Sequence, residues 1–143
     1  MQITRQADYA LRAVLYLARS DPQARIATAE IAREEHIPAT FLAKIVSQLS
    51  AIGVLQAMRG ARGGVRLAKL PNEITLLEIV EAIDGPITLN ECVTNTEACT
   101  MTETCPLRPV WCDAHALLVD KLRQTTFDQL ANARHTTDLP MVV

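Results

Sequence analysis

The sequence predicts a mainly α-helical fold with one small β-hairpin, and three observations support this prediction. Apolar residues recur at helical spacing in three successive segments between residues 4 and 52. A glycine-rich hairpin with basic residues follows directly, and a long helix is predicted from residue 106 to about 124. Three helices followed by a basic hairpin form the arrangement of a winged helix-turn-helix.

The first two predicted helices are short and amphipathic. In the segment 4–20, Thr4 can cap the helix, and small and aliphatic side chains recur on one face. After a polar turn, Thr28 is expected to cap a second helix. That helix should end before the turn at 36–38, because a proline disfavours helical backbone in the residue before it.

The third predicted helix begins near Pro38 and runs to about Ile52, with Gly53 just past its end. At about 100° per residue, one side is apolar and is expected to face the core: Phe41, Leu42, Ile45, Leu49 and Ile52. The opposite side is small, polar and singly basic: Thr40, Ala43, Lys44, Ser47, Gln48 and Ala51. Such a surface can enter the major groove of DNA, where Gln48 can bind adenine bidentately and Lys44 favours guanine or phosphate.

Residues 54–69 predict two short strands joined by a loop that holds three of the five glycines. Arg59 and Arg62 lie in this loop and make it a small, basic β-hairpin wing. In a winged helix-turn-helix, the third helix reads the groove while the wing contacts the backbone or the minor groove. The candidate DNA-binding residues are therefore Thr40, Lys44, Gln48, Arg59 and Arg62.

Charge is distributed unevenly along the chain. The formal net charge is −2, but residues 1–70 hold ten Lys and Arg against five Asp and Glu, whereas residues 71–143 hold four against eleven. The asymmetry suggests that only the first half meets a polyanion, although a solvated charged surface explains the same numbers. We therefore predict a winged helix-turn-helix DNA-binding domain over 1–70 that forms one compact unit with 71–143.

Composition limits the class of protein. At 143 residues with 49% apolar residues, the chain can form one domain with a core. Charged residues interrupt every apolar stretch before about 18 residues, so no transmembrane helix is predicted. The N-terminus lacks the apolar region of a signal peptide and the short lipidation motifs, and we expect a cytoplasmic protein with no membrane partner.

The second half is predicted to be helical on either side of a long loop. A helix over 76–84, which Thr75 is expected to cap, precedes the segment 92–105, which has almost nothing to bury and is expected to be functional or disordered. Pro106 opens the long helix, and a short helix follows at 127–133. The apolar stripe of the long helix consists of Leu107, Val110, Trp111, Ala114, Leu117, Leu118, Lys121 and Leu122. A second copy of the chain is the natural partner for this dimerisation helix, the alternative being that it folds back on its own domain.

All four cysteines, Cys92, Cys99, Cys105 and Cys112, fall within 21 residues. In a cytosolic protein such clustering indicates metal binding or redox chemistry rather than structural disulfides. Thiols separated by six and five intervening residues can wrap an iron–sulfur cluster, and the tight cysteine pairs of structural zinc sites are missing. The residues alone leave a cluster, zinc and uncoordinated thiols open.

The sequence carries no signature of an enzyme. It has no C-x-x-C pair and no nucleophile–base motif, and the glycine-rich loop does not open a helix as phosphate-binding loops do. We therefore do not expect catalytic activity.

Four segments together resemble a known family of bacterial regulators. They are the opening TRQADYALRAVLYLA, the third-helix sequence FLAKIVSQLSAIGVL, the wing RGARGGVRLAK and the triplet Cys92, Cys99 and Cys105. From Met1 to about Ala133 the chain resembles the winged-helix regulators that include NsrR, IscR, RirA and CymR, with a pattern most like the NsrR type. The resemblance implies a homodimeric repressor or regulator of a double-stranded DNA operator. In most members the loop cysteines hold an iron–sulfur cluster.

The resemblance also implies the ligands of that cluster, for which [4Fe–4S] is preferred to [2Fe–2S]. Three ligands would be Cys92, Cys99 and Cys105. Asp8 of the partner subunit would be the fourth, because it aligns with the aspartate of the NsrR-type opening. Arg12, one turn later, would orient Asp8 or neutralise the charge of the cluster. The alternative for Asp8 is a favourable position near the start of a helix.

Two positions bear on this ligand set. Cys112 lies seven residues beyond Cys105, which is about 10 Å along a helix and a long reach for one small cluster. We interpret Cys112 as a buried thiol beside Trp111. The IscR type has a histidine three residues after the third cysteine, whereas this chain has Arg108, which disfavours IscR-type ligation.

Two functional hypotheses follow from the residues and the resemblance. In the first, the part 71–143 holds a cluster-binding loop and dimerisation helices, and the cluster controls operator binding by sensing nitric oxide, iron or cluster status, or redox state. In the second, the chain is a cluster-free regulator that senses oxidants through its thiols or binds a small ligand.

Overall fold

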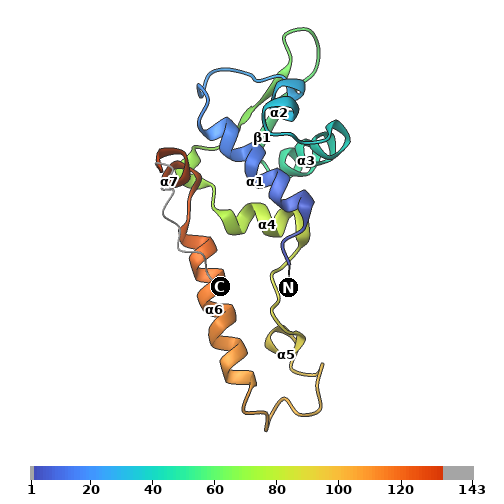
Figure 1. Cartoon of the computed structure of the whole chain (residues 1–143), viewed down its shortest axis with the longest axis vertical. Helices are drawn as coiled ribbons and strands as arrows, with labels where there is room; N and C mark the ends of the chain where they lie inside the picture. Colours follow the sequence, from blue (N-terminus) through green and yellow to red (C-terminus); the bar gives the residue numbers. More distant parts are fainter. Residues whose placement is uncertain (1, 134–143) are drawn as a thin grey trace.

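The computed structural model describes residues 2–133 and shows two regions (Figure 1). The elements follow in the order α1 (Arg5–Ala18), α2 (Thr28–Glu34), α3 (Ala39–Ala51), β1 (Leu55–Met58), β2 (Gly64–Leu67), η1 (Pro71–Glu73), α4 (Leu76–Asp84), α5 (Glu91–Thr94), α6 (Arg108–Gln124) and α7 (Phe127–Asn132). We call residues 88–117 the arm: it carries α5 and the first part of α6 and extends away from the rest of the chain (Figure 1). The remaining described residues, 2–87 and 118–133, form the head.

The head is organised around α1. As predicted, Thr4 caps this helix, and its hydroxyl accepts a hydrogen bond from the backbone amide of Ala7 at 3.1 Å. The core around α1 draws on both halves of the sequence, because Ile74, Ile79 and Phe127 join side chains of α1 and α3 in one cluster. The second half of the chain therefore completes the core of the first half.

Helices α2 and α3 depart slightly from their predicted starts. Thr28 is the first residue of α2 rather than its cap, and Ala27 at the cap position offers no side-chain hydrogen bond. Between the two helices, His36 adopts a positive φ of 52°, which closes the tight turn of the helix-turn-helix. Gly53 lies just past the end of α3 with φ 80°, as predicted.

The predicted apolar side of α3 is buried only in its middle. Leu42, Ile45 and Leu49 are buried. In contrast, Phe41 and Ile52 expose 39% and 47% of their surface, so the prediction that both face the core is wrong. Both lie near the ends of the helix, and only its middle turns lie over the core.

The predicted wing is confirmed as a two-stranded antiparallel hairpin in which Met58 pairs with Gly64. Val65 on β2 also exchanges two backbone hydrogen bonds with Ile26, of 2.8 and 2.9 Å. Gly64 makes this close approach possible, because its φ is +147° and a Cβ there would lie 2.8 Å from the carbonyl oxygen of Ile26. These bonds anchor the wing to the segment that precedes α2.

No residue of the arm is buried. A short helix, α5, interrupts the predicted loop, and the side chain of Asn90 caps it by accepting from the amide of Glu91 at 3.0 Å. The long helix α6 begins at Arg108 and not at Pro106 as predicted, because Pro109 takes the place in the first helical turn that suits a proline.

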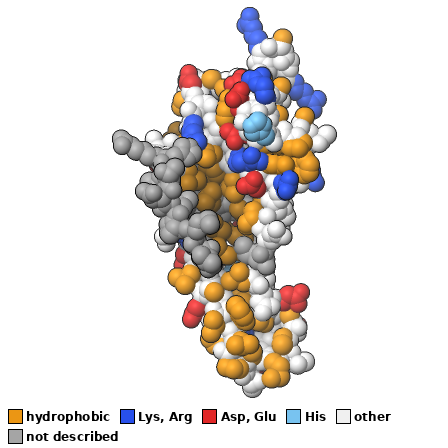
Figure 2. Space-filling model, viewed as in Figure 1, with side chains coloured by type: hydrophobic (Ala, Val, Ile, Leu, Met, Phe, Trp, Pro, Cys, Tyr) orange, Lys and Arg blue, Asp and Glu red, His pale blue; other side chains and the backbone are white. Residues whose placement is uncertain are grey.

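The apolar side chains of helix α6 form two groups, one near each end of the helix. Near its C-terminal end, Leu118, Val119 and Leu122 pack against the second core cluster, which includes residues of α4. Near its N-terminal end, apolar side chains are exposed by 40 to 73% of their surface: Leu107, Val110, Trp111 and Leu117. Figure 2 shows hydrophobic side chains gathered along the arm. The predicted single stripe thus divides into a part that packs on the head and a part whose apolar side chains stay exposed among residues 2–133. None of the helices in this part of the chain is long and apolar enough to cross a membrane.

Candidate nucleic-acid interface and cysteine loop

The exposed side of α3 carries three of the residues predicted to contact DNA. Thr40 and Lys44 are exposed, as is Ser47 on the same side, whereas Gln48 is half-buried. The carbonyl oxygen of the Gln48 side chain accepts a hydrogen bond from Nε2 of Gln6 at 2.7 Å. This side of α3 therefore offers hydroxyl groups, one restrained amide and one cation.

The wing adds two exposed cations. Arg59 and Arg62 lie in the loop between β1 and β2, where both are exposed. A hollow of about 660 Å³ separates this loop from α3, and most of the side chains that line it are Gly, Ala and Ser. The third helix and the wing thus flank one open groove, and of the five residues predicted to contact DNA only Arg59 lines it.

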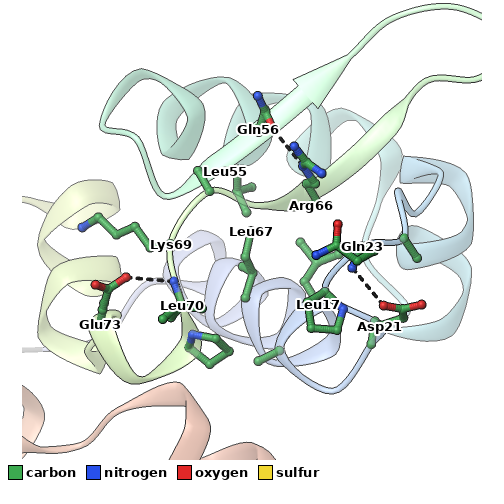
Figure 3. Close-up of a pocket in the computed structure, with 16 residues that line it drawn as sticks. Leu17, Asp21, Gln23, Leu55, Gln56, Arg66, Leu67, Lys69, Leu70 and Glu73 are labelled. Carbon is green, nitrogen blue, oxygen red and sulfur yellow. Dashed lines mark hydrogen bonds between the residues drawn. The ribbon is translucent and has the colours of Figure 1, made fainter.

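Other basic residues of the head are engaged elsewhere. Arg66 and Lys69 line a second hollow, of about 700 Å³. Nε of Arg66 donates to the side-chain oxygen of Gln56 at 2.8 Å, and this bond is drawn in Figure 3. At the edge of the same hollow, Lys69 forms an ion pair with Glu78. On α3 and the wing, by contrast, no ion pair within residues 2–133 involves Lys44, Arg59 or Arg62.

All four cysteines are free thiols on the arm. Cys92 on α5 and Cys105 just before α6 are half-buried, and Cys99 between them is exposed. Cys112 is half-buried rather than buried as predicted, because among the described residues only the short helix α5 lies against this part of α6. Between residues 2 and 133, no three His, Cys, Asp or Glu side chains form a group that could hold a metal ion. The predicted triplet therefore shares one segment without being gathered into a ligand set.

Two hydrogen bonds shape the cysteine segment. The backbone amide of Met101 donates to the sulfur of Cys99 at 3.4 Å. Nε of Arg108 donates to the backbone carbonyl of Cys92 at 3.1 Å. Arg108 therefore ties α5 to the start of α6, at the position where the IscR type has a histidine. Three thiols on one segment are chemically suited to iron, which prefers soft sulfur donors.

Asp8 and Arg12 meet on α1, with 3.3 Å between Oδ2 of Asp8 and Nε of Arg12. The side chain of Asp8 is 59% exposed and lies in the first turn of the helix. Arg12 also donates from Nη1 to the carbonyl of Glu35 at 2.9 Å, and its guanidinium lies 4.9 Å from the centre of the Tyr9 ring. The Tyr9 ring meets Phe41 edge to face, with 5.5 Å between the ring centres. A continuous set of contacts therefore joins Asp8 to the helix-turn-helix turn and to the start of α3.

Sequence reasoning missed two polar contacts that fix the start of α1. The amide and the hydroxyl of Thr4 both donate to the carboxylate of Asp84, at 3.1 and 2.5 Å. Gln6 donates to Gln48, as described above. The partners lie 80 and 42 positions apart, and periodicity reports only on local structure, so neither pair leaves a signal in the sequence.

The fold and the surface define a class of protein. A three-helix unit with an exposed polar third helix and a basic wing is a winged helix-turn-helix of the DNA-binding type. Residues 3–133 match the Rrf2 family, described as iron-dependent transcriptional regulators. The chain belongs to this family.

Similar proteins agree with this assignment. The chain is 33% identical over 131 residues to the HTH-type transcriptional regulator NsrR of Shouchella clausii, which covers 91% of this chain and 88% of that protein. It is 27% identical to the HTH-type transcriptional regulator IscR of Pectobacterium carotovorum, over 97% of this chain and 84% of that one. The solved structure of CymR, the global cysteine regulator of B. subtilis, has a TM-score of 0.78 and 26% identity over 92% of this chain and 96% of that one. The predicted winged-helix class is confirmed, and the chain is a DNA-binding transcriptional regulator rather than an enzyme.

Proposed function

We propose that this regulator is a homodimeric repressor in which an iron–sulfur cluster on the cysteine loop controls binding to a double-stranded DNA operator. One observation carries the proposal: a head with exposed basic side chains on α3 and the wing is joined to an arm that bears all the cysteines and buries none of its residues. Nitric oxide, iron or cluster status, or redox state would be the signal.

Operator binding is assigned to the exposed side of α3 and to the wing. Lys44 and Gln48 suit base edges in the major groove, and Thr40 suits a base or a phosphate. Arg59 and Arg62 suit phosphates or the adjacent minor groove. The exposure of four of these side chains, with Gln48 half-buried at the edge, supports this assignment.

A second copy of the same chain is assigned to the exposed apolar face of the arm. This face consists of Leu107, Val110, Trp111 and Leu117. An apolar patch of this kind marks an interaction site, and two-fold symmetry would pair the face with itself. The dimer would then hold two α3 helices at the spacing of successive turns of the DNA.

Cys92, Cys99 and Cys105, with the partner subunit's Asp8, are assigned as the ligands of the cluster, for which we favour [4Fe–4S]. When bound, the cluster supplies redox chemistry and reactivity toward small molecules, and an oxygen ligand among sulfurs leaves one iron labile. The donor set fits this group chemically: the three thiols are free on an unburied segment, and Asp8 is accessible on the surface of α1.

Arg12 connects the proposed ligand Asp8 to the DNA-reading helix. The guanidinium binds Asp8 on one side and the carbonyl of Glu35, at the start of the turn before α3, on the other. It also rests on Tyr9, which contacts Phe41 on the first turn of α3. A change in the partners of Asp8 would therefore alter the contacts that place α3. The forms with and without the cluster would then differ in these contacts, and a population shift requires such a difference.

Anaerobic purification with visible absorption spectroscopy and iron and sulfide analysis tests the cofactor. We expect iron and sulfide in the wild-type protein, loss of the cluster in Asp8→Ala, and retention in Cys112→Ala. Protein that contains neither iron nor sulfide would exclude the cluster. Loss in Cys112→Ala together with retention in Asp8→Ala would make Cys112 the fourth ligand.

Gel-shift titration of the same preparations tests the control of DNA binding. We expect the cluster-loaded dimer to bind a selected operator more tightly than the cluster-free protein. Equal affinities of the two forms would refute control by the cluster while leaving DNA binding itself intact.

A cluster-free regulator that senses oxidants through its thiols, or that binds a small ligand, is the second candidate. Two observations favour thiol sensing: the thiol of Cys99 is exposed, and the cysteines within residues 2–133 are not gathered into a ligand set. In this case anaerobic protein would be colourless. A peroxide would then change its operator affinity, and Cys99→Ser would remove that response.

A further inference from the structure

One hydrogen bond between α1 and α3 restrains a side chain that we assign to DNA reading. Nε2 of Gln6 donates to Oε1 of Gln48 at 2.7 Å, and both side chains are half-buried. Gln6 lies in the first turn of α1, and Gln48 lies one turn beyond Lys44 on α3. The bond therefore joins the start of the first helix to the reading side of the third.

This bond holds the side chain of Gln48 in place beside Gln6. A glutamine amide has an acceptor at one end and a donor at the other, and its two orientations present opposite patterns to a base. In this structure the oxygen of Gln48 is turned toward Gln6, and no described residue accepts from its Nε2. The donor end is thus available to DNA, and the oxygen keeps a second lone pair for an incoming N–H group.

The backbone at the start of α1, which carries Gln6, is held by contacts of Thr4. Thr4, two residues earlier, caps α1 and donates twice to Asp84, so the first turn of α1 is fixed to the end of α4. The backbone of Gln6 is therefore fixed relative to α4. A side chain that is held before binding loses less conformational freedom on contact with a base, and it discriminates more sharply as a result.

We propose that Gln6 is a positioning residue for sequence recognition, which holds the Gln48 side chain in place and thereby sharpens the discrimination between bases at the pair that Gln48 reads. The inference rests on the proposed DNA-reading role of α3. The Gln6–Gln48 bond is not needed to hold α1 against α3, because these helices already pack together in the core and through the contact between Tyr9 and Phe41.

The experiment begins with an operator selected by the full-length wild-type protein from random duplex DNA. Each base pair of that operator is then substituted singly, and affinities are measured by fluorescence anisotropy. The variant Gln48→Ala identifies the base pair that Gln48 reads, because discrimination is lost at that pair. For the wild type we expect about tenfold discrimination there, within the range of a bidentate contact.

In Gln6→Ala we expect discrimination at that same base pair to fall to about twofold, with the other positions and the affinity for non-specific DNA unchanged. Gln6→Glu can still hold Gln48 by accepting from its Nε2, so discrimination at that base pair should be kept better than in Gln6→Ala. The double variant Gln6→Ala/Gln48→Ala should lose no more than Gln48→Ala alone, because the two residues act as one unit. Gln23→Ala, in the exposed turn after α1, is the matched control and should behave as wild type.

Three results would overturn the inference: a Gln6→Ala variant with wild-type base preference, a loss that adds in full to that of Gln48→Ala, or an equal loss on all duplexes with a lower melting temperature. The last result would make the bond a structural contact. If the wild-type protein selects no sequence at all, the proposed operator binding fails. A selected operator that Gln6→Ala reads normally contradicts only the role of Gln6.

Discussion

The head and the arm use their apolar residues in opposite ways. Every buried apolar residue among those described lies in the head, whereas the arm exposes Met101, Leu107, Val110, Trp111 and Leu117. The head can therefore fold on its own contacts, and the apolar side chains of the arm gain burial only from something outside residues 2–133. The stability of the fold therefore resides in the head, and the assembly of two copies is assigned to the arm.

The largest expected effect sharpens this comparison with one leucine from each region. Leu49 is fully buried in the core, and Leu49→Ala should lower the free energy of unfolding by about 2–5 kcal/mol through lost burial and a residual cavity. Leu117 is 73% exposed, and Leu117→Ala should change the same quantity by less than about 0.5 kcal/mol. Urea unfolding of both variants at one low protein concentration measures the two values. Similar losses would mean that the arm also contributes to the fold of the single chain.

A charge on the exposed face of the arm tests the assembly side of the comparison. Leu117→Asp should weaken the dimer by at least about tenfold, because a carboxylate would have to be buried between two copies without a partner. Sedimentation velocity over a range of concentrations measures the association. Gln124→Asp, at the exposed end of α6, is the matched control and should leave it unchanged. A wild-type protein that sediments as a monomer would show that a second copy does not cover this face.

Contacts with DNA phosphates should depend on the head alone. Arg59→Ala should weaken operator binding and reduce the slope of log affinity against log salt by about one, because one phosphate contact is lost. Arg123→Ala removes an exposed arginine of α6 that pairs with Asp120, and it should leave the slope unchanged. Anisotropy titrations at several salt concentrations measure both. An unchanged slope in Arg59→Ala would exclude a phosphate contact at this position.

The local structure of the head could be predicted from the sequence because its signals are local. Thr4 and Thr75 cap helices as predicted, and Gly53 and Gly85 follow helix ends with positive φ. The glycines of the wing likewise mark the hairpin. In each case a single residue satisfies a backbone requirement within a few positions, and this is the information that spacing and residue type carry.

Burial and long-range polar contacts could not be predicted in the same way. Phe41 has the spacing of a core residue, but its exposure depends on which elements cover the end of α3. Val119 packs in the second cluster although it was not assigned to the stripe of α6, because α4 approaches the helix from that side. The partners of Gln6 and Thr4 are equally determined by packing between distant segments.

The candidate functional residues show the same division between local signals and long-range packing. Lys44, Arg59 and Arg62 were predicted from a helical face and a loop, and the side chains of all three are exposed on α3 and the wing. The ligands Cys92, Cys99, Cys105 and Asp8 stay a prediction, since their assembly would involve a loop closure and a second chain. The sequence pattern identifies these residues, but only packing between segments and copies can bring them together.

The smallest expected effect concerns a polar contact on the surface of the head. The hydroxyl of Tyr16 on α1 donates to the carboxylate of Glu30 on α2 at 2.9 Å. This hydrogen bond, with burial and the charge of Glu30, raises the pKa of Tyr16 above its ordinary value of 10.0. Folding therefore favours the protonated phenol. The stability that this preference contributes is complete below pH 10 and is lost as the pH rises through the raised pKa.

Tyr16→Phe removes the hydrogen bond together with its pH dependence. The difference in free energy of unfolding between wild type and variant should be constant from about pH 8 to pH 9.5 and should shrink above about pH 10, where the phenol ionises. Urea unfolding of both proteins across this range measures the difference, and other titrating groups cancel because they are common to both. A difference that stays constant to about pH 11 would mean that the folded head does not hold the Tyr16 proton against Glu30. The packing of α1 against α2 would then depend on the core and on the hydrogen bond from Arg12 to the carbonyl of Glu35.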